Sequence, residues 1–253
     1  MLVKEGNYKE HLVITSPYVT LIGEDREMVN INFDDKTESP VGGDTSTRCA
    51  VYVKSSAVGF AAENVTFENT YQYLGNGNIS NESADALRVD ADQSTFVNVK
   101  LLGYQDTLNT SSNNQYYYKC YIAGNIDYIY GSAQALFDEC ELVFRYNANK
   151  NSGYVTAPKT SADKEYGYIF NNCRIYAEAG CNGSKYLLAR PWEPDGAATF
   201  INCYMDGIIN AVQPYGDMSG NLAVNARFQE YYTYGGGFQI NNNRPQITKD
   251  QAE

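Results

Sequence analysis

Several residue types on which many enzymes rely are scarce in this chain of 253 residues. It has one histidine, His11, and its six cysteines form no Cys-x-x-Cys pair, which argues against a zinc site. It also lacks the Gly-x-Ser-x-Gly motif, so a Ser-His-Asp triad would have to use His11. Neither a glycine-rich phosphate loop nor a dinucleotide fingerprint occurs. We therefore expect neither a zinc site nor a nucleotide-binding loop.

Basic residues and long apolar runs are also scarce. With 19 Lys and Arg against 30 Asp and Glu, the net charge is −11, so no basic stripe is available for nucleic acid or an anionic membrane surface. No run of 18 apolar residues occurs, and we expect no membrane span. The opening "MLVKEGNYKE" lacks the apolar core of a signal peptide and reads as a strand already under way. We expect an excised or truncated domain.

Six short segments share one pattern, which gives the chain an internal repeat. The pattern is aromatic-x-x-(Val or Cys)-x-apolar, and Ala62 is the only first residue that is not aromatic. The shortest intervals between fourth positions are 20 and 21 residues. One strand-rich unit per 20-odd residues is typical of a solenoid. The segments are 62–67, 96–101, 117–122, 137–142, 170–175 and 200–205.

The repeat predicts an all-β fold, a single-stranded right-handed parallel β-helix that forms one domain over residues 1–253. Stacked coils place like residues above like, so the fourth positions form one internal column. We expect the cysteines of this column to pack as small apolar side chains and not as disulfides, and no pairing is predicted for Cys49 and Cys181. The column consists of Val65, Val99, Cys120, Cys140, Cys173 and Cys203.

Three polar segments interrupt or follow the repeat. Residues 71–82 and 147–165 are rich in Asn, Gly, Ser and charged residues, which indicates loops placed to flank a groove. Residues 239–253 show no strand pattern, and we predict a polar tail there.

Two aspartates occupy matching places on two consecutive coils that carry no inserted loop. Asp106 follows Val99 by seven residues, and Asp127 follows Cys120 by seven. Coils stack at the strand spacing of roughly 4.8 Å, and two carboxylates held that close do not both ionise easily. A lone aspartate would more simply be a solvated turn residue. The pair, next to Gln105, instead indicates an acid beside a nucleophile or base.

The segment "LARPW" supplies two further candidates. The guanidinium of Arg190 is suited to keep one aspartate ionised and oriented. Trp192 is the only tryptophan, and it serves either as a packing residue or as a platform on which a sugar stacks.

These segments together resemble a known family. "GYQDTL" (103–108), "NIDYIYGSAQALFDEC" (125–140) and "LARPW" (188–192), in this order, resemble the signature segments of pectin methylesterases, or pectinesterases. The resemblance spans roughly residues 3–238. It implies a right-handed parallel β-helix that hydrolyses methyl esters of galacturonate in pectin (homogalacturonan) and releases methanol without a metal or cofactor.

The resemblance also implies roles for individual residues. Asp127 would be the nucleophile, held by Arg190, and Asp106 the general acid and then the base. Gln105 would donate to the oxyanion. The substrate-binding residues implied by the family's aromatic and oxyanion positions are Trp192, Tyr130, Tyr128 and Ser83.

The chain departs from the family pattern at several positions. Ser83 stands where a second oxyanion Gln is usual, Asp85 where an apolar residue is usual, and Asn109 where a Tyr is usual. The late Gly-Trp segment is replaced by "YGDM" (215–218), and the family's first few dozen residues have no counterpart. These departures bear on rate and substrate preference, and they leave Asp106, Asp127 and Arg190 in place.

Three alternatives stay open at this point. They are a divergent esterase for another acyl ester, a non-catalytic β-helix that binds polysaccharide, and a pectate lyase, which would need calcium-binding acidic clusters. If the chain is a pectinesterase, we expect a monomer. We expect it to be secreted or on the cell surface, because the substrate of the family is a wall polymer.

Overall fold

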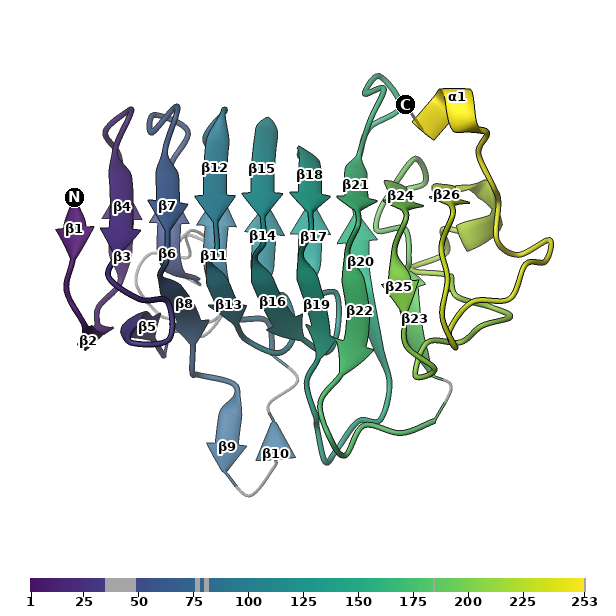
Figure 1. The fold of residues 1–253 in the computed structure, drawn as a ribbon, viewed down its shortest axis with the longest axis horizontal. Helices are drawn as coiled ribbons and strands as arrows, with labels where there is room; N and C mark the ends of the chain where they lie inside the picture. Colours follow the sequence, from purple (N-terminus) through teal and green to yellow (C-terminus); the bar gives the residue numbers. More distant parts are fainter. Residues whose placement is uncertain (35–48, 76–77, 80–81, 184, 253) are drawn as a thin grey trace.

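The chain winds through three parallel β-sheets, and its coils stack along one long axis with the N-terminus at one end and the C-terminus folded back beside β21 (Tyr168–Asn171) (Figure 1). The computed structural model describes residues 1–34, 49–75, 78–79, 82–183 and 185–252. Helix in these residues is limited to the 3-10 turn η2 (Ala223–Asn225) and α1 (Lys249–Ala252), neither long enough to cross a membrane. The predicted all-β, right-handed parallel β-helix is confirmed.

The nine-stranded sheet carries a ladder of stacked aromatic rings on its inner face. The rings of Phe96, Tyr117, Phe137, Phe170 and Phe200 follow one another at 4.7–4.8 Å, which is the spacing of neighbouring strands. The first residues of the repeat pattern therefore hold the coils in register. The strands are β1 (Leu2–Val3), β4 (Thr20–Gly23), β7 (Ala61–Glu63), β12 (Ser94–Val97), β15 (Asn114–Tyr118), β18 (Gln134–Asp138), β21 (Tyr168–Asn171), β24 (Ala197–Ile201) and β26 (Arg227–Tyr231).

Tight turns lead from six of these strands, β7, β12, β15, β18, β21 and β24, into the eight-stranded sheet. One residue in each of these six turns has a left-handed φ of 52–54°, as at Asn64, Asn98 and Asn172. The next residue is the fourth position of the repeat, and all six members of that column are buried. The strands are β2 (Gly6–Lys9), β5 (Val29–Phe33), β8 (Thr66–Asn69), β13 (Lys100–Leu102), β16 (Tyr121–Gly124), β19 (Glu141–Phe144), β22 (Arg174–Ala177) and β25 (Tyr204–Met205).

The four cysteines of the column are buried and form no disulfide, as predicted. None of the six cysteines forms a disulfide, and the thiol of Cys140 lies 3.4 Å from the carbonyl oxygen of Tyr117 on the preceding coil. Cys173 and Cys203 make the same contact with Phe137 and Phe170. Stacked small thiols therefore fill this corner of the core.

The seven-stranded sheet completes each coil and carries the candidate site. The turns that enter it contain Asp106 and Asp127, and loops of different length enter it on the other coils. The strands are β3 (Leu12–Ile14), β6 (Cys49–Val53), β11 (Asp85–Val89), β14 (Leu108–Thr110), β17 (Ile129–Gly131), β20 (Gly153–Pro158) and β23 (Tyr186–Ala189).

Loops project from one side of the molecule at this same turn (Figure 1). The predicted loop 71–82 contains a small antiparallel pair, β9 (Tyr73–Gly75) and β10 (Asn78–Ile79), and the loop after β19 projects in the same direction. The predicted loop 147–165 is corrected, because β20 runs through its middle as a strand of the core.

The predicted polar tail, residues 239–253, is also corrected over its described part, 239–252. Arg244 is fully buried and pairs with Glu230 of β26, Nε to Oε1 at 2.9 Å. Glu230 takes the ladder position above Phe200, and it also accepts hydrogen bonds from Tyr215 and Thr233. This segment therefore folds back and closes the C-terminal end of the β-helix.

Candidate active site

Asp106 and Asp127 occupy equivalent turns on adjacent coils, as their spacing predicts. The residues before them, Gln105 and Ile126, form a parallel bridge, and the Asp106 amide donates to the Ile126 carbonyl at 3.0 Å. Both aspartates have a left-handed φ, 65° and 48°. Asp and Asn adopt this conformation more readily than other residues with a Cβ, which suits an aspartate to this turn.

The surrounding chain explains why the turn closes at this point. The hydroxyl of Thr107 is buried and donates to the Ala123 carbonyl at 3.0 Å, which ties one coil to the next. A Cβ at Gly124 would lie 2.6 Å from the Tyr104 carbonyl oxygen, so only glycine fits. In "GYQDTL", the threonine is therefore structural, and Gln105 and Asp106 are left partly exposed.

Arg190 holds Asp127 through both carboxylate oxygens. Nε donates to Oδ1 at 2.8 Å and Nη2 to Oδ2 at 2.5 Å. The guanidinium lies over the ring of Tyr154, 4.3 Å from its centre, a partner that the sequence motifs did not indicate. Burial raises the pKa of Asp127, and the guanidinium opposes this shift by stabilising the carboxylate. Asp127 is thus oriented as an anion with little water around it.

Asp106 has a different electrostatic environment, which favours its neutral form. Burial raises its pKa to about 8, a hydrogen bond with Ser83 opposes the shift, and the charges of Asp85 and Asp127 add to it. One carboxyl is therefore protonated at neutral pH while its neighbour is paired with a cation, the division of roles that an acid and a nucleophile require.

Gln105 lies on the same turn, and its backbone is fixed by a residue that the sequence analysis missed. The buried side chain of Gln72, from the 71–82 loop, donates to the Gln105 carbonyl at 3.0 Å. The side-chain carbonyl oxygen of Gln72 accepts a hydrogen bond from the backbone amide of Tyr104 at 2.9 Å. A glutamine in a polar loop gives no sequence signal for this bracing role.

The three aromatic candidates differ in what they expose. Trp192 is 36% exposed, whereas Tyr130 is 8% exposed and its ring lies 5.7 Å from that of Trp192. The Tyr130 hydroxyl donates to Asp85. Tyr128 is fully buried in the core, edge-on to Phe144, so the prediction that it binds substrate is wrong. Its motif position reflects packing.

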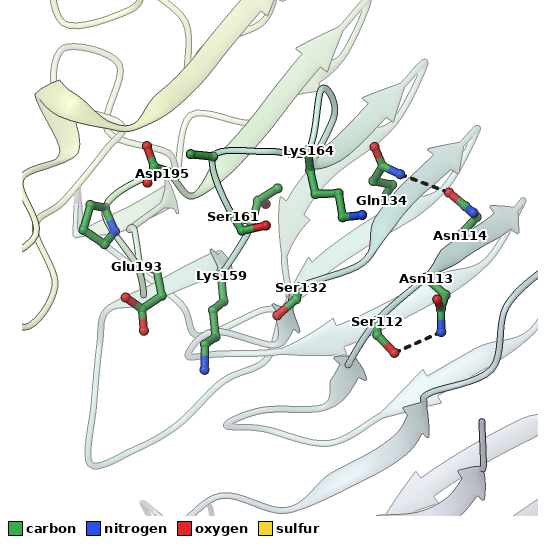
Figure 2. A pocket seen from close by; sticks show the side chains of 13 residues that line it. Ser112, Asn113, Asn114, Ser132, Gln134, Lys159, Ser161, Lys164, Glu193 and Asp195 are labelled. Carbon is green, nitrogen blue, oxygen red and sulfur yellow. Dashed lines mark hydrogen bonds between the residues drawn. The ribbon is translucent and has the colours of Figure 1, made fainter.

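A polar cavity of about 600 Å³ lies at the far end of the same strands (Figure 2). Asp106 and Asp127 precede β14 and β17, whereas the cavity is lined by the segments that follow β14, β17, β20 and β23. Lys159 lines it and also lies 4.8 Å from the ring centre of Trp192. Trp192 therefore lies between Tyr130 of β17 and Lys159 at the edge of this cavity.

The described residues contain no group of three His, Cys, Asp or Glu side chains arranged to hold a metal ion. A nucleophilic carboxylate, a protonated carboxyl beside it and a nearby amide are suited to acyl transfer.

Comparison with known proteins decides the family. The family model described as Pectinesterase matches residues 1–246. The chain belongs to the pectinesterase family. It is 32% identical to pectinesterase A of Dickeya chrysanthemi, over all of this chain and 79% of that protein. The pectin methylesterase from Erwinia chrysanthemi superposes with a TM-score of 0.86 at 30% identity, over 99% of this chain and 84% of that one. The carrot enzyme gives 0.85 at 25% identity, over 99% and 79%.

Membership confirms the predicted resemblance and the enzyme class, a carboxylic ester hydrolase.

Proposed function

We propose that this pectinesterase removes methyl esters from galacturonate units of homogalacturonan by two-step acyl transfer, with Asp127 as nucleophile. The observation that carries the proposal is the contrast between two adjacent carboxyls. Asp127 is paired with Arg190 through both oxygens, and Asp106 is held in its neutral form.

In the first step, an Asp127 oxygen attacks the ester carbonyl, and the carbonyl π electrons move onto its oxygen. The amide of Gln105 donates to this oxyanion, a contribution of about 3 kcal/mol for one such donor. As the intermediate collapses, the bond to the methoxy oxygen breaks, and Asp106 transfers its proton there. Methanol leaves, and an anhydride joins Asp127 to the galacturonate.

In the second step, the ionised Asp106 accepts a proton from water, which attacks the galacturonate carbonyl. The anhydride bond to Asp127 breaks, and the free galacturonate carboxyl leaves. Asp127 returns as an anion against Arg190, and Asp106 returns protonated. Two stacked carboxyls thus take the roles that a serine nucleophile and a histidine base have in other hydrolases.

The pH dependence follows from the two pKa shifts. Asp127 reacts only when ionised, so activity falls as the pH drops through its raised pKa. Asp106 acts as an acid only when protonated, so activity falls as the pH rises through about 8. We therefore expect a bell-shaped pH profile of activity whose alkaline limb lies near pH 8.

The polymer would extend from the aspartates across Trp192 toward the polar cavity that Lys159 lines. A related pectin methylesterase has been solved in complex with a hexasaccharide, which supports a polysaccharide as substrate. We propose that the enzyme acts on this polymer outside the cell, because pectin is a wall component.

The test is methanol release from highly methylated pectin without added metal, measured together with the carboxyl groups set free. The proposal expects one carboxyl per methanol and no unsaturated product. Unsaturated products that require calcium would indicate a lyase. Binding to pectin by a folded protein that releases no methanol, from pectin or from other esters, would indicate a non-catalytic β-helix. Either result contradicts the proposal.

A further inference from the structure

A third aspartate extends the catalytic pair by one coil. Asp85 lies two residues before the strand pair Leu87 and Leu108, which places it in register with Asp106. The Ala86 amide donates to the Thr107 carbonyl at 2.8 Å, in keeping with this register. Asp85, Asp106 and Asp127 therefore occupy matching positions on three consecutive coils, spaced at roughly 4.8 Å.

Asp85 is held as a hydrogen-bond acceptor in the protein interior. Its side chain is 1% exposed, and the Tyr130 hydroxyl donates to its two oxygens at 3.0 and 3.2 Å. The amide of Asn109 donates to Oδ2 at 3.3 Å and to the Tyr130 hydroxyl at 2.9 Å. A buried carboxyl that receives donated hydrogen bonds is stabilised in its charged form.

Asp85 and Asn109, two positions where the chain departs from the family pattern, are thus in direct contact. A buried carboxylate without partners would be costly, and Asn109 supplies one of the donors that Asp85 uses. The departures form one local arrangement beside the catalytic acid.

We propose that Asp85 is a positioning residue whose negative charge keeps the transferable proton on Asp106. The inference rests on the proposed function for its catalytic meaning. During methanol release, Asp106 must hold a proton at the pH where Asp127 is already ionised. A fixed anion on the preceding coil extends the pH range over which both conditions are met.

The other charged and polar groups around Asp106 do not remove this effect. Ser83 donates to Asp106 and Arg190 attracts the ionised form, so both favour loss of the proton. Asp127 acts in the same direction as Asp85, and Asp85 has the larger influence of the two. Around Asp127 the perturbing groups are Arg190 and Lys150, so Asp85 should leave the acidic limb unchanged.

The direct test is an NMR titration of 13C-labelled aspartate carboxyls in the parent and in Asp85→Asn. We expect the pKa of Asp106 to fall by roughly one unit in the variant, with that of Asp127 unchanged. This measurement needs no turnover, so it tests the inference even if the parent releases no methanol. That last result would overturn the proposed function instead.

The pH profile of kcat/KM for methanol release gives the functional counterpart. In Asp85→Asn only the alkaline limb should move, by roughly one unit to lower pH, and Asp85→Glu should restore it. Asp250→Asn, an exposed control that removes the same charge at α1, should leave both limbs in place. If Asp85→Asn does not fold, Asp85→Ser serves the same comparison. A folded variant with an unchanged Asp106 pKa, or with both limbs shifted equally, overturns the inference.

Discussion

At the scale of single residues, this site separates two identical carboxyls by their surroundings. Asp106 and Asp127 have the same side chain, the same left-handed backbone and the same place on adjacent coils. Only Asp127 receives a guanidinium through both oxygens. The proposed roles of acid and nucleophile therefore rest on neighbours that come from other coils.

The role of Gln105 can be tested by removing its amide. Because it would donate only to the oxyanion of the intermediate, Gln105→Ala should lower kcat on the order of a hundred-fold and leave KM nearly unchanged. Steady-state methanol release gives both constants. A variant whose KM rises while kcat stays at the parent value would show that Gln105 only binds substrate.

Arg190 should affect the pH profile as well as the rate. In Arg190→Ala the pKa of Asp127 rises further, since the cation that opposes its burial is gone. The acidic limb should therefore move to higher pH, and kcat should fall by roughly a hundred-fold or more. The control is Arg174→Ala, an exposed arginine of β22 that stacks on Tyr176. An unshifted acidic limb in Arg190→Ala would contradict the assigned role.

At the scale of elements, the repeat can be predicted from the sequence because every coil places the same kinds of residue at the same positions. The aromatic ladder and the Val/Cys column both repeat along the sequence. Counting seven residues from Val99 and from Cys120 therefore identifies Asp106 and Asp127 as equivalent positions. Contacts that occur only once leave no such pattern in the sequence and could not be predicted from it. Gln72, Tyr154 and the Asp85–Tyr130 hydrogen bond each join segments far apart in the chain.

Tyr128 shows the limit of carrying a motif position over to a role. It directly follows Asp127, the proposed nucleophile, yet the turn at Asp127 directs its ring into the core against Phe144. The sequence alone does not show toward which side a residue beside a left-handed turn will point.

The Val/Cys column predicts tolerance to substitution. Cys140→Val places at the fourth position the residue type found at Val65 and Val99, so the free energy of unfolding should change by less than about 1.5 kcal/mol. Urea unfolding measures this value. Because the six cysteines form no disulfide, a reducing agent should leave the Tm of the parent unchanged. A fall in Tm on reduction would instead show that the cysteines form a stabilising disulfide.

At the scale of the whole molecule, the end of the β-helix has to be closed as well as built. The aromatic ladder stops at Phe200, and the next coil places the buried carboxylate of Glu230 above it, paired with Arg244. The sequence suggested a tail here, because a polar segment reads as solvated. Its arginine is instead neutralised and fully buried, a contact between distant segments that local composition does not reveal.

The buried ion pair between Arg244 and Glu230 should contribute to the stability of the fold. Arg244→Met leaves Glu230 buried without its cation, and the free energy of unfolding should fall by about 3–5 kcal/mol. Lys9→Met, which breaks the exposed pair with Asp34, should change it by less than about 1 kcal/mol. Urea unfolding of both variants provides the comparison. Equal losses would show that the C-terminal segment does not lock the end of the solenoid.

The measurement that tests the central claim most directly is methanol release by Asp127→Asn beside the parent, on highly methylated pectin, with both proteins shown to be folded by circular dichroism. The substitution removes the nucleophilic oxygen and keeps the shape of the side chain. The account predicts that the parent releases methanol and that the variant is slower by at least about a thousand-fold. A folded variant that releases methanol within ten-fold of the parent rate would contradict Asp127 as the nucleophile.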